Sequence, residues 1–185
     1  MSQSRILDLV NKGLSQSSFL DIYRKPVLLF STDDDDEDET VETDIRNITD
    51  TDLLTCEGQS PTTTTKFSNS RVFFLEKTAR NSSLEVTLGR DPSNDIIVSL
   101  PSVSKRHAFF REINGNWYVV DNKSTNGTNI DNTLLGPYEK ALLRDNSRLV
   151  FGYGAIARFF TPIGLWGVLC LHTGLSFLQT TIFDD

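Results

Sequence analysis

The stretch SKRHAFFREINGNWYVVDNKSTNGT, residues 104–128, decides the fold of this chain. Two apolar runs, residues 108–113 and 117–121, flank Asn114-Gly115-Asn116. Asn-Gly between two strand-like runs is the strongest short-range signal for a β-hairpin, because both residues tolerate a positive φ. The segment therefore predicts two antiparallel strands joined by a tight turn.

Short apolar runs separated by turn residues continue on both sides of this hairpin. Residues 84–88, for example, alternate in hydrophobicity as a half-buried strand does. No helical period separates the runs, so the sequence predicts an all-β protein built as an antiparallel β-sandwich. The other predicted strands lie at 72–75, 96–98, 134–135, 141–143, 148–151 and 155–160.

Charge is distributed unevenly along the 185 residues, whose net charge is −7. Residues 33–57 contain 12 acidic residues against the single Arg46, a net charge of −11. Residues 66–161 contain 13 Lys and Arg against 9 Asp and Glu, a net charge of +4. An acidic segment attached to a mildly basic domain favours self-association or an anionic ligand. The basic residues form no dense stripe, which argues against nucleic acid.

The composition divides the chain into four parts. Residues 1–31 are predicted to hold a short amphipathic helix at 3–14, a further turn at 19–23 and an edge strand at 27–30 that follows a proline. Residues 32–66 are acidic and threonine-rich, with too little apolar surface to offset the entropy of ordering, and are predicted to be disordered. Residues 67–165 form the sandwich, and residues 166–185 are an apolar tail predicted to be helical.

The tail leaves two interpretations open, because residues 159–183 carry no formally charged side chain. A membrane anchor is one, although Pro162, His172 and several glycines lower its hydrophobicity below that of an ordinary span. A buried strand followed by a packing helix is the favoured one. Cys56 and Cys170 have no disulfide or zinc spacing, and the N-terminus lacks a signal-peptide pattern, so we expect a cytoplasmic protein.

Three loops carry polar groups suited to binding a phosphate ester rather than to cleaving one. Arg90 offers a planar fork of donors that can take two phosphate oxygens at once. Ser104 can donate its hydroxyl, and Lys105 can add a point charge beside it. No nucleophile elbow, P-loop or paired-cysteine metal motif is present, so we expect no enzyme activity, no metal and no cofactor.

In their order and separations these loops resemble the forkhead-associated (FHA) domain, a phosphothreonine-binding β-sandwich. The resemblance covers roughly residues 67–165. The matching residues are Gly89-Arg90, Asn94-Asp95-Ile96, Val103-Ser104-Lys105-Arg106-His107-Ala108, Trp117, Asp121, Ser124-Thr125-Asn126-Gly127-Thr128 and Phe151-Gly152.

The resemblance implies a role for each loop residue. Arg90, Ser104 and Lys105 would bind the phosphate, Thr125 would make a second contact near it, and Asn126 would bond the main chain of the bound peptide. Three further residues would support the site, Gly89, His107 and Gly127. The expected function is a phosphothreonine-binding adaptor in Ser/Thr-kinase signalling. A phosphate-independent scaffold and a membrane-tethered signalling subunit are the alternatives.

The acidic segment contains a candidate ligand for the same domain. Residues 38–44 resemble the Thr-Val-Glu-Thr kinase site of some small bacterial FHA regulators, with Thr40 and Thr43 as the candidate phosphorylation sites. In those regulators the phosphorylated threonine folds back onto the FHA domain and stops partner binding. Asp44 stands where they have a second threonine, and a solvated acidic linker remains the alternative. The partners expected are therefore phosphothreonine proteins, a Ser/Thr kinase, or the chain's own segment.

The tail also fits a bacterial origin. Pro162-x-Gly164-Leu165-Trp166 is similar to the Pro-x-Gly-Leu-aromatic pattern of the short helix that follows the last strand in some bacterial FHA proteins.

Overall fold

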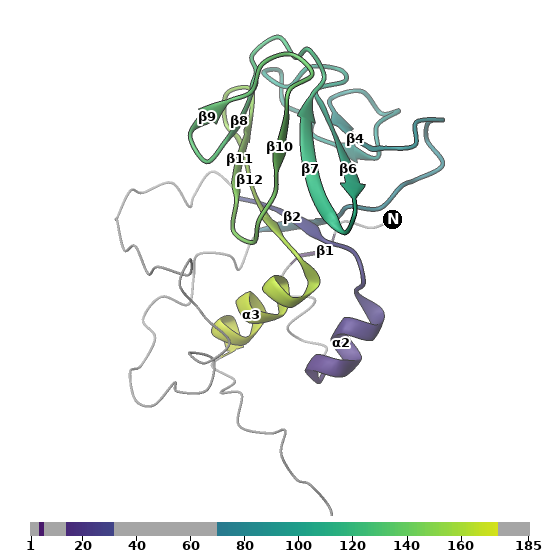
Figure 1. Cartoon of the computed structure of the whole chain (residues 1–185), viewed down its shortest axis with the longest axis vertical. Coiled ribbons are helices and arrows are strands. Elements are labelled where there is room, and N and C mark those ends of the chain that lie inside the picture. The colour runs from purple at the N-terminus through teal and green to yellow at the C-terminus, as the bar shows by residue number, and fades with distance from the viewer. Residues whose placement is uncertain (1–3, 6–13, 32–69, 174–185) are drawn as a thin grey trace, which may run out of the picture.

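The computed structural model describes residues 4–5, 14–31 and 70–173, which form two β-sheets with two helices at one end (Figure 1). One sheet has seven strands in the order β1-β3-β2-β12-β11-β8-β9, and the other has five in the order β10-β7-β6-β4-β5. The elements are β1 (Ser4–Arg5), α2 (Gln16–Ile22), β2 (Val27–Phe30), β3 (Arg71–Phe74), β4 (Val86–Gly89), β5 (Ile96–Ile97), β6 (Ala108–Ile113), β7 (Asn116–Asp121), β8 (Thr128–Ile130), β9 (Thr133–Leu134), β10 (Lys140–Leu142), β11 (Arg148–Phe151), β12 (Ala155–Phe160) and α3 (Pro162–Thr173).

The core lies between the two sheets and confirms the predicted sandwich. Leu88 and Phe110 of the five-stranded sheet and Leu28, Leu149 and Phe151 of the seven-stranded sheet are each 0% exposed. The rings of Phe110 and Phe151 meet edge to face at 6.3 Å between centroids, a favoured aromatic geometry.

The predicted hairpin is confirmed. Strands β6 and β7 pair from Ala108 opposite Asp121 to Ile113 opposite Asn116. Asn114 and Gly115 form the turn with φ of 51° and 78°, the left-handed values that a two-residue hairpin turn requires. The described strands pair antiparallel except β4 and β5, which are parallel.

Strand β2 is not the edge strand that the sequence predicts. It lies inside the seven-stranded sheet, paired with β3 on one side and β12 on the other. Leu28 and Phe30 face the main core, and Val27 and Leu29 face a second cluster with Phe19 of α2 and Leu165 of α3. A strand covered on both faces reads as a continuous apolar run, which explains why periodicity could not place it.

The remaining terminal predictions are met in part. The predicted turn at 19–23 belongs to α2, which begins after the cap Ser15, whose Oγ accepts from the N–H of Ser18 at 3.3 Å. The predicted helix at 3–14 is wrong at Ser4–Arg5, which pair as a strand with β3. Residues 6–13 lie outside the described residues. So do residues 32–66, including Thr40 and Thr43, and the end of the tail from residue 174.

Helix α3 begins four residues before the predicted tail boundary at 166. Thr161 caps it, since its Oγ1 accepts from the N–H of Gly164 at 3.2 Å. Asp145, in the loop between β10 and β11, accepts hydrogen bonds from both the N–H and the hydroxyl of Thr161. The cap is therefore fastened to the sandwich. Over the described residues, the chain has no helix with the length and apolar character needed for a membrane span.

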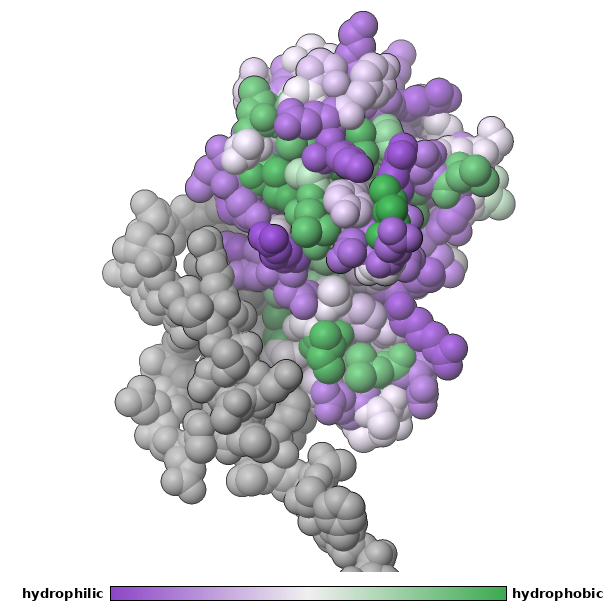
Figure 2. Space-filling view, in the orientation of Figure 1, coloured by the Kyte–Doolittle hydropathy of each residue, from purple (hydrophilic) through white to green (hydrophobic). Residues whose placement is uncertain are grey.

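Figure 2 shows the face seen in Figure 1 as mostly hydrophilic, with small hydrophobic patches scattered between polar groups. Scattered apolar residues of this kind are ordinary on a protein surface.

Two glycines of α3 test the fastened cap. A β-carbon at Gly164 would collide with the carboxylate of Asp145, whereas Gly167 has open space around that position. We expect Gly164→Ala to lower the free energy of unfolding by about 1–3 kcal/mol, as overpacking does. Gly167→Ala should raise it by up to about 1 kcal/mol through helix propensity. Urea denaturation measures both, and equal stability of the two variants would contradict the contact.

Candidate functional site

The topology brings three polar loops to one edge of the five-stranded sheet. Strand β6 runs antiparallel to both β4 and β7, so the end of β4, the start of β6 and the end of β7 lie together. Arg90 follows β4, Ser104 and Lys105 precede β6, and Thr125 and Asn126 follow β7. These are the loops at the top of Figure 1.

Arg90 is bound to the second loop through its backbone and its side chain. Its N–H donates to the carbonyl of Ser104 at 2.9 Å, and its Nε donates to the carbonyl of Val103 at 3.2 Å. The two terminal nitrogens form no hydrogen bond with any described residue. An exposed guanidinium with its stem fixed and its outer edge open is ready to take a bidentate anion.

Ser104 and Thr125 join the second and third loops. The Ser104 hydroxyl oxygen accepts from the N–H of Thr125 at 3.0 Å, and the same hydroxyl donates to Oγ1 of Thr125 at 3.3 Å. The hydroxyl hydrogen of Thr125 is therefore left for an anion, and the hydroxyl of Ser104 can rotate toward the same anion.

Asn126 is also anchored. Its Nδ2 donates to the carbonyl of Ser102 at 2.8 Å. One hydrogen of that amide is used, while the carboxamide oxygen and the other hydrogen make no bond to a described residue. The side chain can therefore still donate to and accept from a peptide main chain.

Lys105 exposes its side chain, and its backbone holds the loop. Its carbonyl accepts from the N–H of Asp91 at 3.1 Å and from Nδ2 of Asn94 at 2.7 Å. A β-carbon on Gly89 would collide with this same carbonyl. Glycine at 89 is what lets the first two loops approach so closely.

His107 lies beneath the loops and is 0% exposed. Its Nδ1 accepts from the N–H of Ser104 at 3.0 Å, and its Nε2 lies 3.1 Å from the carbonyl of Gly127. The ring is therefore neutral with its proton on Nε2, and it links the second loop to the third. Burial lowers the pKa of His107, a stronger effect than the hydrogen bond to Gly127, which raises it.

Gly127 completes the third loop with φ of 79°, where a β-carbon would also strike the side chain of Leu134. The carboxylate of Asp121 fixes the same loop. It accepts from the N–H of Ser124 at 3.0 Å, from the Ser124 hydroxyl at 2.6 Å and from the Thr128 hydroxyl at 2.8 Å.

Sequence reasoning missed the group that holds the first loop. The Asp95 carboxylate is buried and accepts from Nζ of Lys77 at 2.9 Å, the N–H of Thr78 at 2.8 Å and the N–H of Thr87 at 2.9 Å. Burial opposes ionisation, yet hydrogen bonds from Thr78, Thr87 and Lys77 together outweigh it and hold the pKa of Asp95 well below its usual range. Position 95 matches the family pattern, but its partner Lys77 lies in no motif.

The described residues contain no group of three or more His, Cys, Asp or Glu side chains placed to hold a metal ion.

Fold and loops together define a β-sandwich that presents three polar loops at one edge. Residues 86–152 match the family model described as the FHA domain, and this part of the chain is an FHA domain.

A curated relative matches a short part of the chain. The chain is 47% identical over 45 residues to a protein of Corynebacterium diphtheriae named oxoglutarate dehydrogenase inhibitor. The match covers 24% of this chain and 32% of the length of that relative.

Two solved structures are similar at low identity. One is Mycobacterium tuberculosis EmbR in complex with a low-affinity phosphopeptide, at 21% identity and a TM-score of 0.42 over 49% of this chain and 22% of that one. The other is the N-terminal FHA domain of Saccharomyces cerevisiae Rad53p in complex with a phosphothreonine peptide, at 21% identity and a TM-score of 0.41 over 49% of this chain and 83% of that one.

The buried histidine makes stability depend on pH. The lowered pKa of His107 means that the unfolded chain binds a proton more readily than the folded one, so its contribution to stability falls as pH drops below about 6.5. Urea unfolding at pH 7.5 and 5.5 should show this loss, and a smaller loss in His107→Gln. An imidazole titration by NMR that gave His107 a pKa of 6.5 or above would contradict it.

Proposed function

We propose that this chain is a phosphothreonine-peptide-binding adaptor in Ser/Thr-kinase signalling. One observation carries the proposal. Three loops from three strand ends carry Arg90, Ser104 and Asn126 at one edge of the sandwich, where His107 links the second loop to the third and Arg90 bonds the first loop to the second. Arg90 and Asn126 have donors left for a ligand, and the hydroxyl of Ser104 can rotate its hydrogen from Thr125 to a ligand.

The chemistry of the edge suits a phosphate monoester. A phosphothreonine carries about −1.5 to −2 charges and three acceptor oxygens. In the proposed complex Arg90 takes two oxygens, the hydroxyls of Ser104 and Thr125 donate to the same group, and Lys105 adds a second positive charge. Charge-assisted hydrogen bonds are the strong ones, so this cluster supplies most of the affinity.

Asn126 supplies the peptide contact in this proposal. Its free carboxamide oxygen accepts from a main-chain N–H beside the phosphothreonine, and its remaining amide hydrogen donates to a carbonyl. Main-chain bonds hold a peptide extended whatever its sequence. The phosphate therefore provides affinity, and neighbouring loops provide the choice of partner.

The protein in this proposal binds without turnover. Its partners are phosphothreonine-containing proteins or a Ser/Thr kinase, and neither a metal nor a cofactor takes part. The name of the curated relative, an inhibitor, agrees with regulation by binding.

Replacing Arg90 tests the proposal. Arg90→Ala should weaken binding of a phosphothreonine peptide by at least about 30-fold, because an unmatched charge pair of this kind costs about 2 kcal/mol or more. Arg90→Lys should recover only part of the affinity, since a point charge lacks the fork. Isothermal titration calorimetry measures all three proteins.

Arg24→Ala is the matched control, because that side chain is 76% exposed and, within the part of the chain that the structure describes, forms an ion pair only with Asp21, at 3.9 Å. It should bind as the wild type does. Partner pairing that survives Arg90→Ala unchanged would support a phosphate-independent scaffold instead.

The acidic segment is proposed as an internal ligand of the same site, and strand pairing favours this. Phe30 pairs with Arg71, so the chain between them leaves and returns at neighbouring points, and the N–H of Ser31 donates to Ile156 at 3.2 Å. Thr40 is ten residues beyond Phe30 and can lie at most about 35 Å from it.

The distance from Phe30 to the loop with Asn126 is shorter than the length of chain between Phe30 and Thr40. Phe30 pairs with Ala157, which is five residues, or ~17 Å of extended strand, from Gly152. The N–H of Gly152 donates to the carbonyl of Gly127 at 3.0 Å, beside Asn126. A tether of this length presents a phosphothreonine at roughly millimolar effective concentration.

Phosphorylation of the segment tests this second part. Stoichiometric phosphorylation at Thr40 or Thr43 should block binding of an added phosphothreonine peptide, and Thr40→Ala with Thr43→Ala should abolish the block. Fluorescence anisotropy with a labelled peptide measures the competition. Unchanged affinity after phosphorylation would rule the internal ligand out and leave the segment as a linker.

A further inference from the structure

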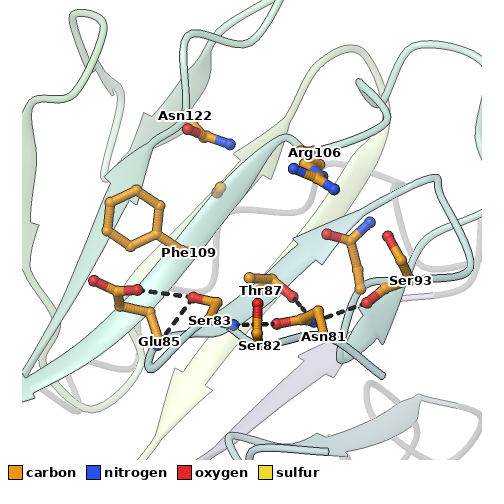
Figure 3. A pocket seen from close by; sticks show the side chains of 11 residues that line it. Asn81, Ser82, Ser83, Glu85, Thr87, Ser93, Arg106, Phe109 and Asn122 are labelled. Atoms are coloured by element: carbon orange, nitrogen blue, oxygen red, sulfur yellow. Dashed lines mark hydrogen bonds between the residues drawn. The ribbon is translucent and has the colours of Figure 1, made fainter. Parts of the chain in front are cut away.

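A pocket of about 370 Å³ lies on the outer face of the five-stranded sheet, beside the loops proposed to bind phosphate (Figure 3). Polar side chains line most of it, and the ring of Phe109 forms an apolar wall. The lining residues that matter here are Asn81, Ser83, Glu85, Asn94, Arg106 and Asn122.

The polar side chains on one rim of the pocket already have hydrogen-bond partners. Glu85 accepts from the Ser83 hydroxyl at 2.8 Å and forms an ion pair with Arg111 at 3.0 Å. The amide of Asn81 donates to Thr87 at 3.1 Å and to the carbonyl of Ser93 at 2.7 Å. These groups have little capacity left for a ligand.

The opposite rim is open. Figure 3 shows Arg106 and Asn122 across the pocket from Glu85. Arg106 is exposed, and neither its guanidinium nor the side-chain amide of Asn122 forms a hydrogen bond or an ion pair with a described residue. A cation and an amide over a partly apolar hollow offer donors to a carboxylate and a wall to its methylene groups.

The pocket is joined to the phosphate loops. Arg106 is two residues from Ser104, so the two Cα atoms are at most about 7.6 Å apart. Asn94 lines the pocket and also donates to the carbonyl of Lys105 at 2.7 Å. An extended peptide advances ~3.3 Å per residue, so a side chain two to four residues from a bound phosphothreonine reaches this rim.

We propose that this pocket binds an acidic side chain of the same phosphothreonine peptide, with Arg106 as the residue that selects it. The inference rests on the proposed function, because the phosphate sets where the peptide lies. The carboxylate accepts hydrogen bonds from the guanidinium of Arg106 and from the amide of Asn122, and its methylene groups pack on Phe109.

The charges around Arg106 set the size of the effect. Asp91 lies close enough that the charge of Arg106 helps to lower its pKa, although the larger cause is the hydrogen bond from the N–H of Ser93. Glu85 is paired with Arg111, and Asp95 is paired with Lys77. Asp91 forms no ion pair with a described residue, and its charge competes with the ligand for Arg106.

The test uses the full chain and a set of peptides with a central phosphothreonine in a neutral alanine and serine background. Single glutamates are placed at each of the four positions on either side, and glutamine at the same positions provides the uncharged match. Anisotropy at low ionic strength measures affinity. Because Arg106 is exposed, glutamate at one or two positions should improve affinity about two- to five-fold over glutamine.

Three variants assign the gain to the pocket. Arg106→Gln should remove the gain while leaving binding of the neutral peptide in place. Lys123→Gln removes a charge from an exposed residue of the next loop, outside the pocket, and should keep the gain. Asp91→Asn keeps the acceptor for Ser93 while removing the competing charge, and should enlarge the gain.

The outcomes separate this inference from the proposed function. Binding of the neutral peptide without any Arg106-dependent glutamate gain would overturn the acidic pocket alone. No binding of any phosphothreonine peptide by the wild type would overturn both. A gain equally reduced by Lys123→Gln would show a diffuse charge effect and would also overturn the pocket.

Discussion

The two hydrogen bonds of the buried His107 ring are the constraint on which the edge with Arg90, Ser104 and Asn126 depends. They join the N–H of Ser104 to the carbonyl of Gly127, two residues 23 positions apart in the sequence. Without the ring the N–H of Ser104 would be left unpaired, at a cost of about 1–3 kcal/mol, and the carbonyl of Gly127 would keep only the hydrogen bond from the N–H of Gly152. The hydroxyl of Ser104 and the amide of Asn126 keep their spacing because this connection is rigid and neutral.

Much of the fold could be predicted because its signals are local. Strands β11 and β12 coincide with the predicted runs 148–151 and 155–160, and the turn at Asn114-Gly115 follows from residues that accept positive φ. The loops were found in the same way, since a polar motif next to each strand marks the edge where strand ends meet. The roles expected for Thr125, Asn126 and His107 rest on family resemblance rather than on local pattern.

What local pattern could not supply is pairing between distant segments. Strand β2 is a short apolar run after a proline, and its place inside the sheet is set by β3, which follows forty residues later. The Asp95 carboxylate accepts hydrogen bonds from Thr78 and Lys77, which lie 17 and 18 residues away in the sequence and share no motif with it. The pocket at Arg106 depends on where the loop containing Asn81 folds over the sheet. In each case the deciding neighbour is remote in sequence.

The position of β2 also explains how the sheet can accommodate so long a segment before β3. The composition predicts an unstructured chain for this segment. For such a chain, each doubling of the length of a closed loop costs about 0.6 kcal/mol of conformational entropy. The forty residues from 31 to 70 thus cost about 1 kcal/mol more than a ten-residue connection would. Burying the four apolar side chains of Val27–Phe30 contributes about 1.5–3 kcal/mol each. The entropic cost of the long segment is therefore small compared with the stability that strand β2 contributes. The acidic sequence of the segment can change without loss of the fold that presents Arg90 and Asn126.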